Sequence, residues 1–181
     1  PCDVKVNGCL KYELLSITAD AGKNYTYSIR VTNSCASKMV YTAIQVPDAM
    51  VALEPANNSI YTGIDGRQYI VRSHNFTPMY SIRFKSTTDS IANGQSEIFQ
   101  YTLPAQADVT YINITSRLAN QTYYEAHLNT FNCPVGTTPT LSRPSQNRDF
   151  NQTSTQNSLL LFPNPSSGVV YADCANRLRC G

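Results

Sequence analysis

Apolar and polar residues alternate along most of the first 131 residues of the chain. In residues 25–32, tyrosine, isoleucine and valine occupy every second position, and threonine, serine and arginine occupy the positions between them. Such alternation is typical of antiparallel strands with one buried face, because successive side chains of a strand point to opposite faces. The pattern predicts eight strands, in residues 10–17, 25–32, 39–46, 67–73, 79–86, 97–103, 109–118 and 122–131.

Turn sequences such as "PANNS" and "GIDGR" separate these segments, and no amphipathic helix is expected between them. Short strands at this spacing, joined by connections long enough for a Greek key, are typical of two packed antiparallel sheets. The predicted fold class is therefore all-β, an immunoglobulin-like antiparallel β-sandwich.

The composition changes after residue 136. Residues 137–158 include 17 serine, threonine, asparagine, glutamine or proline residues among 22, too few apolar groups for a core. An apolar stretch, "LLLFPNPSSGVVYADC", follows at 159–174. The predicted organisation is a sandwich domain (1–136), a linker (137–158) and a short tail (159–181) with one C-terminal strand.

Composition and charge exclude several classes of function. Charged residues make up 14% of the chain and the net charge is +2, with no basic run of the kind that binds nucleic acid. No apolar segment approaches the roughly 18 residues needed to span a membrane. Tryptophan is absent, but 12 tyrosines and many threonines suit an exposed β-rich protein.

Six cysteines predict a disulfide-bonded protein. They form no CxxC pair and have too few histidine partners for a zinc site, so disulfides in an oxidising compartment are expected. Spacing alone leaves the connectivity open. The preferred pairing is Cys2–Cys9, Cys35–Cys133 and Cys174–Cys180, and it implies a secreted or outer-surface location.

Two resemblances add to this picture. The segments "YSIRVTNSC", "IANGQSEIFQYTLPAQAD" and "YYEAHLNTFNCPVG" resemble an immunoglobulin-like domain of secreted and cell-surface proteins of Bacteroidota. That resemblance covers most of the first 136 residues. It implies a structural or adhesive module and transfers no active site.

The stretch "LLLFPNPSSGVVYAD" resembles the start of the C-terminal sorting domain of type IX secretion cargo. Its two prolines favour an extended entry, and Gly168 supplies a turn before the strand. In that family further strands follow, whereas here 13 residues follow Gly168, so the resemblance implies a truncated sorting domain. The residues of the sorting segment, which is also a candidate donor strand, are Leu160, Phe162, Pro163, Asn164, Pro165, Gly168, Val169 and Tyr171.

Candidate catalytic chemistry is sparse. His127 and Glu125 share a strand face, but general-base catalysis also needs a nucleophile in a cleft, so a surface histidine is the favoured interpretation. His74 lies in a loop, and Asp65 with Gly66 marks a turn rather than a calcium loop. No hydrolase, zinc-protease or phosphate-binding motif is present. The chain is therefore predicted not to be an enzyme and to need no metal or cofactor.

Glycans are candidate modifications. The tripeptide Asp89-Ser90-Ile91 resembles the O-glycosylation signal of Bacteroidota proteins, with Ser90 as acceptor, and the linker is a second O-glycan candidate. Six N-x-S/T sequons offer N-glycan acceptors in a eukaryotic secreted protein. They are at Asn24, Asn57, Asn75, Asn113, Asn120 and Asn151.

The favoured function is a non-enzymatic secreted or cell-surface structural protein, including the self-assembling subunit of an extracellular filament. An apolar strand on a polar tether suits β-strand addition to a neighbouring sheet, and a head-to-tail contact of this kind generates an open filament. The alternative is a monomeric carbohydrate-binding or adhesin module, in which strand-face tyrosines stack on sugars. An enzyme with an unrecognised site, built around His127 and Glu125, is a third hypothesis.

Overall fold

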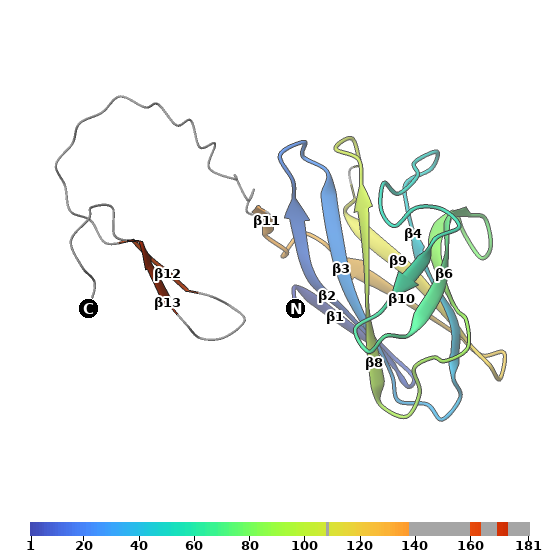
Figure 1. Cartoon of the computed structure of the whole chain (residues 1–181). Coiled ribbons are helices and arrows are strands. Elements are labelled where there is room, and N and C mark those ends of the chain that lie inside the picture. Colours follow the sequence, from blue (N-terminus) through green and yellow to red (C-terminus); the bar gives the residue numbers. More distant parts are fainter. Residues whose placement is uncertain (108, 138–159, 164–169, 174–181) are drawn as a thin grey trace. The chain divides into compact units, whose positions relative to one another are not determined.

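The computed structural model describes residues 1–107, 109–137, 160–163 and 170–173 (Figure 1). The chain divides into two compact units, Pro1–Leu141 and Ser142–Gly181. Strands are the regular elements throughout the described ranges, and these ranges contain no helix able to cross a membrane.

The first sheet, sheet A, lies on one side of the sandwich. Its strands run in the order β1-β2-β3-β8, all antiparallel, and β11 pairs in parallel with the last residues of β2. The bounds are β1 Asp3–Asn7, β2 Leu10–Ala19, β3 Tyr25–Asn33, β8 Gln95–Leu103 and β11 Val135–Thr137.

The second sheet, sheet B, is antiparallel throughout and runs in the order β10-β9-β4-β7-β6-β5. Its bounds are β4 Met39–Gln45, β5 Ile60–Thr62, β6 Gln68–Asn75, β7 Ser81–Ser86, β9 Tyr111–Leu118 and β10 Tyr123–Asn129. The two sheets confirm the predicted β-sandwich, and each of the eight predicted strands is present.

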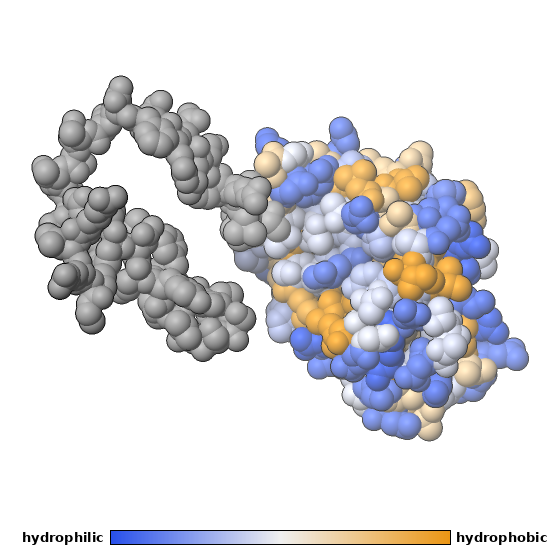
Figure 2. All heavy atoms as spheres, viewed as in Figure 1, coloured by the Kyte–Doolittle hydropathy of each residue, from blue (hydrophilic) through white to orange (hydrophobic). Residues whose placement is uncertain are grey.

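The core forms between the inner faces of the two sheets, where the predicted apolar positions are buried. Phe99 of β8 contacts rings of the opposite sheet, with its centroid 4.9 Å from that of Phe84 and 5.1 Å from that of Tyr69. Full burial of such a side chain contributes about 1.5–3 kcal/mol to folding. On the outside, apolar residues form separate small patches between polar ones on the face shown in Figure 2, as is normal for a folded domain.

The disulfides correct the predicted pairing. Cys2 is bonded to Cys133 and Cys9 to Cys35, with Cα–Cα distances of 4.9 and 5.4 Å. Cys2 and Cys9 flank β1, and an extended segment of that length places them about 20 Å apart, whereas a disulfide needs Cα atoms within about 7 Å. The predicted Cys2–Cys9 and Cys35–Cys133 bonds are therefore wrong. Cys174 and Cys180 lie outside the described residues.

The second unit contains an antiparallel strand pair, β12 (Leu160–Pro163) and β13 (Val170–Asp173). The strand predicted after Gly168 is thus present as β13, and the apolar segment before it forms its partner. Most of the predicted linker and the predicted turn residues Asn164, Pro165, Gly168 and Val169 lie outside the described residues.

Candidate functional site

Strand β1 lies where the two sheets meet, between β2 and β10. It pairs with β2 along its backbone, but most of its side chains face solvent, and Val4 and Val6 are 41% and 68% exposed. Toward β10 it uses side chains: Asn7 Nδ2 donates to the Glu125 carbonyl at 2.9 Å, and Asp3 accepts the Asn129 N–H at 2.7 Å. Because disulfides flank β1 at both ends, this strand is held by covalent bonds as well as by hydrogen bonds.

The Asp3 carboxylate is ionised in this setting. Burial raises its pKa, but the N–H groups of Asn129 and Val4 and the ammonium of Lys5, 3.3 Å away, together bring the pKa below its usual value. A charged acceptor strengthens the bond to the β10 backbone. Asp3 is therefore an electrostatic contact across the β1–β10 boundary.

The outer edge of β8 is occupied by residues from elsewhere in the domain. The Tyr61 hydroxyl of β5 donates to the Ile98 carbonyl at 2.8 Å and accepts the Gln100 N–H at 3.3 Å. Further along β8, the Thr102 backbone exchanges 2.8 Å hydrogen bonds with Leu53 and Glu54. An edge whose backbone groups are already bonded is a poor template for another strand.

Glu97 is a buried carboxylate at the β5–β8 boundary. One of its oxygens accepts the Ile64 N–H at 2.8 Å and the Ile98 N–H at 3.0 Å, and the other accepts the Tyr69 hydroxyl at 3.2 Å. Burial and the nearby Glu97 charge raise the pKa of Tyr69. The carboxylate lies directly over Gly63, where an added Cβ would be 2.1 Å from Oε2.

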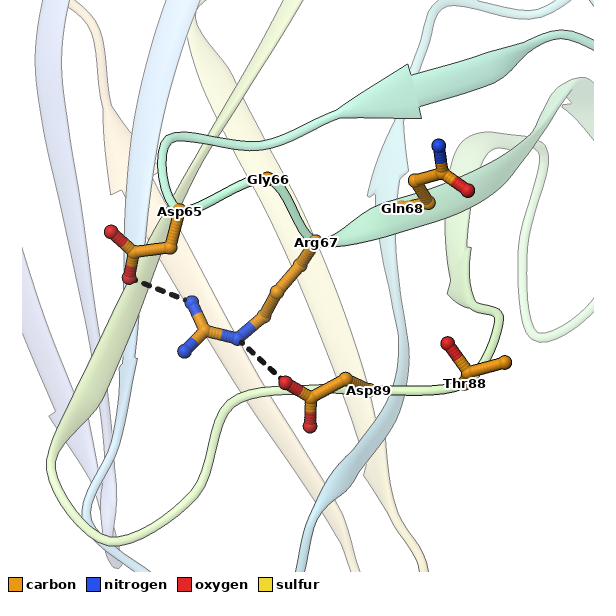
Figure 3. A pocket seen from close by; sticks show the side chains of 6 residues that line it. All are labelled: Asp65, Gly66, Arg67, Gln68, Thr88 and Asp89. Atoms are coloured by element: carbon orange, nitrogen blue, oxygen red, sulfur yellow. Dashed lines mark hydrogen bonds and ion pairs between the residues drawn. The ribbon is translucent and has the colours of Figure 1, made fainter.

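A small open pocket of about 190 Å³ lies between the β5–β6 and β7–β8 loops (Figure 3). The Arg67 guanidinium extends between Asp65, 2.8 Å away, and Asp89, 3.6 Å away, and its side chain is only 9% exposed. Asp89 also pairs with Lys38, and the Ser90 N–H and Lys38 lower the pKa of this carboxyl. The charges of the pocket neutralise one another, so the pocket is better explained as a contact between two loops than as a catalytic site.

The sequence-predicted catalytic residues are not brought together in a cleft. Glu125 and His127 are exposed on the outer side of β10, and His127 Nδ1 is hydrogen-bonded to the Asn113 side chain. His74 lies within β6 and not in a loop as predicted, and its ring centroid is 6.5 Å from that of Phe76. Asp65 and Gly66 form the predicted turn, with Gly66 at φ 77°. Within the described ranges, no three His, Cys, Asp or Glu residues are grouped so as to hold a metal ion.

The glycan candidates differ in access. Ser90 is 4% exposed and its hydroxyl donates to the Met39 carbonyl, so its acceptor oxygen is buried in the folded domain, and O-glycosylation at Ser90 stays a prediction. The amide nitrogens of Asn24, Asn75 and Asn113 donate to neighbouring groups. Asn57 and Asn120 are exposed and use their side-chain oxygens, so their nitrogens are the accessible sequon acceptors. Asn151 lies outside the described residues.

A search of known protein families finds no match to the chain, and no curated protein matches it. The resemblances to an immunoglobulin-like surface domain and to a type IX sorting segment stay predictions.

Proposed function

We propose that the chain is a non-enzymatic structural module of a secreted or cell-surface protein. The observation that supports this role best is the pair of disulfides at the two ends of β1. Such bonds persist in oxidising compartments and are rare in the cytosol. For the 131- and 26-residue separations, loop-closure reasoning assigns stabilisations of about 5 and about 3.5 kcal/mol.

The occupied sheet edges support the same role. Tyr61 and the segment around Glu54 cover β8, and Asp3 and Asn7 connect β1 to β10. These contacts protect the folded domain from uncontrolled pairing with other strands, a recurrent requirement for exposed β-proteins. The resemblance of the tail to a sorting segment supports type IX secretion as the proposed export route.

The test is the redox state and the location of the native protein. Peptide mapping of unreduced material should recover Cys2 linked to Cys133 and Cys9 linked to Cys35, with no alkylation of these four thiols before reduction. An antibody against the domain should label intact source cells or the culture medium. Free thiols at these positions, or labelling only after permeabilisation, would overturn the proposal.

A filament subunit linked by strand addition is the more specific form of this proposal. It is supported by β12 and β13, which form a two-stranded sheet of their own. An isolated two-stranded ribbon is marginally stable in water and gains from pairing with a further strand or packing against one. Because β8 is covered, the short strands β5 and β11 are the edges at which we propose that an incoming strand pairs.

Deletion of residues 159–181 tests assembly separately from folding. The shortened chain should keep the circular dichroism spectrum of the sandwich and scatter light as a monomer, whereas the full chain should form larger species. Assembly that persists after the deletion would exclude strand addition by the tail.

The alternative role, a monomeric carbohydrate-binding or adhesin module, requires a ligand-binding face on the sandwich itself. The outer side of sheet B is the face that supports this candidate, because in the described part of the chain its lysine and arginines form no ion pair with an acid.

A further inference from the structure

The outer side of sheet B carries two neighbouring rows of side chains across its strands. The strand register aligns Lys85, Tyr41, Arg117 and Tyr123 in one row, and Arg72, Arg83, Ala43, Thr115 and Glu125 in the next. The alternate residues of these strands, such as Ile82, Phe84 and Ile114, are buried in the core, so the two rows face outward. We call the set Tyr41, Arg72, Arg83, Lys85, Arg117 and Tyr123 the cation–aromatic face.

The charge of this face is not neutralised by its surroundings. The described residues contain ten lysines and arginines, and five of them form ion pairs with acids. Four of the remaining five belong to the cation–aromatic face, and the fifth is Lys23. Arg72 is directly opposite Arg83, an arrangement of like charges that costs stability. Glu125 is the one acid within the two rows.

Aromatic rings hold two of these cations in place. The guanidinium carbon of Arg83 lies 5.5 Å from the centre of the Tyr41 ring, and that of Arg117 lies 5.8 Å from the centre of the Tyr123 ring. The Nε–H groups of both arginines are buried and have no hydrogen-bond partner among the described residues. A ligand on this face would therefore meet the terminal NH2 groups of the two guanidiniums rather than their Nε–H groups.

The next row supplies further hydrogen-bonding groups. Gln45, Asn113 and His127 lie side by side, with Asn113 bonded to both neighbours. The face therefore combines cations, an exposed aromatic ring at Tyr123, which is 52% exposed, and amide groups. Arginine matches the geometry of a carboxylate, the amides match hydroxyl groups, and the ring matches the apolar side of a sugar.

We propose that the cation–aromatic face binds an acidic polysaccharide. Its carboxylates pair with Arg72, Arg83, Lys85 and Arg117, and a sugar ring stacks on Tyr123. Adjacent strands are about 4.8 Å apart, so cations spread over β6, β7 and β9 suit an extended chain of charges rather than one small anion. The choice of a polysaccharide over other polyanions rests on the proposed extracellular role.

Binding of the full-length protein to polygalacturonate, a polymer of carboxylated sugars, tests the proposal by calorimetry. Neutral dextran and polyglutamate are the comparison polymers. We expect binding to polygalacturonate that weakens with salt, no binding to dextran and at least tenfold weaker binding to polyglutamate. Equal binding to polyglutamate or to dextran, or no binding to polygalacturonate, would overturn the proposal.

Matched variants locate the site. Arg83→Gln with Arg117→Gln should weaken binding by about tenfold, as expected for the loss of two ion pairs that solvent partly screens. Lys23→Gln with Lys38→Gln removes the same charge elsewhere and should change affinity by less than about twofold, since exposed charges contribute little. If the arginine double variant is less stable, Lys85→Gln replaces it as the test, because Lys85 is exposed and its substitution should not affect folding. An equal loss of affinity in all variants would show that net charge alone governs binding, and would refute the site. That outcome would not affect the thiol-mapping test of the proposed structural role.

Discussion

Glu97 and Gly63 provide the sharpest test of the packing between the two sheets. The three heavy atoms nearest to a Cβ at position 63 all belong to the Glu97 carboxyl group. Gly63→Ala should therefore destabilise the domain through displacement of that carboxylate, and not through the backbone, because the φ angle of Gly63 lies outside the left-handed region. The prediction is that Gly63→Ala becomes harmless once Glu97 is replaced by alanine.

The magnitudes follow from the hydrogen bonds of the carboxylate. Glu97→Ala leaves the Tyr69 hydroxyl and the Ile98 N–H without this acceptor, while the Ile64 N–H can turn to water. Each unpaired buried donor costs about 1–3 kcal/mol, and part of this cost is offset because the variant no longer buries a charged group. The free energy of unfolding should therefore fall by about 3 kcal/mol. Gly63→Ala alone should cost about 2 kcal/mol, as a steric clash in a packed region does.

In the Glu97→Ala background the clash is absent. Alanine at position 63 should then cost nothing, or add about 0.5 kcal/mol by restricting the unfolded chain. The two changes should therefore couple by about 2 kcal/mol. Urea denaturation, followed by far-ultraviolet circular dichroism, measures the four free energies of unfolding.

Gly66→Ala is the matched control within the same turn. Gly66 has a φ of 77° and open space around it, so alanine there should cost about 1 kcal/mol through the backbone alone. That cost should be the same with and without Glu97. If Gly63→Ala cost as much in the Glu97→Ala background as in the wild type, the steric explanation would be refuted.

Two further predictions concern single side chains. The Tyr101 hydroxyl is buried without a hydrogen-bond partner among the described residues, so Tyr101→Phe should raise the free energy of unfolding by about 1 kcal/mol. Tyr12→Phe is the control: it removes a 3.2 Å hydrogen bond to the Tyr124 carbonyl and should lower the free energy of unfolding by a similar amount. Destabilisation by Tyr101→Phe in urea titrations would contradict this prediction. The pKa of Asp3 is lower in the folded state than its usual value of 3.8. The ionised carboxylate therefore contributes to the free energy of unfolding above pH 3.8, and this contribution is lost as the pH falls through the lower folded-state pKa. Asp3→Asn should flatten the acid side of a pH–stability curve measured by denaturation, and parallel curves for wild type and variant would count against the Asp3–Asn129 contact.

The long strands were predictable because their alternation continues over seven or more positions with consistent burial. Phe99, Tyr101 and Leu103 share a face in the sequence pattern and are buried together in β8. Glu97 falls on the same buried face of the alternating pattern. A charged residue at such a position could have indicated from the sequence that its carboxylate has buried hydrogen-bond partners. Strands β1, β5 and β11 were missed because each is short and β1 exposes its valines.

Long-range partners could not be predicted from local pattern. The disulfide bonds depend on where β1 lies relative to β3 and β10, which no spacing between cysteines encodes. The cation–aromatic face likewise depends on the arrangement of strands and not on local sequence. Arg72 and Arg83 lie on the consecutive strands β6 and β7, whereas Arg117 lies much later in the sequence, on β9. The three form no basic run, and the strand order of sheet B brings them onto one surface.

The Cys2–Cys133 bond has a consequence for how the domain bears load. A pulling force applied to the chain on either side of the domain passes from residue 2 to residue 133 through one S–S bond. The residues between them form a closed loop outside the path of the tension and are not stretched. With both disulfides reduced, unravelling the 131-residue span, which includes the 26-residue Cys9–Cys35 loop, would lengthen the molecule by roughly 450 Å. The oxidised domain is thus an almost inextensible link, and a reducing agent converts it into an extensible one.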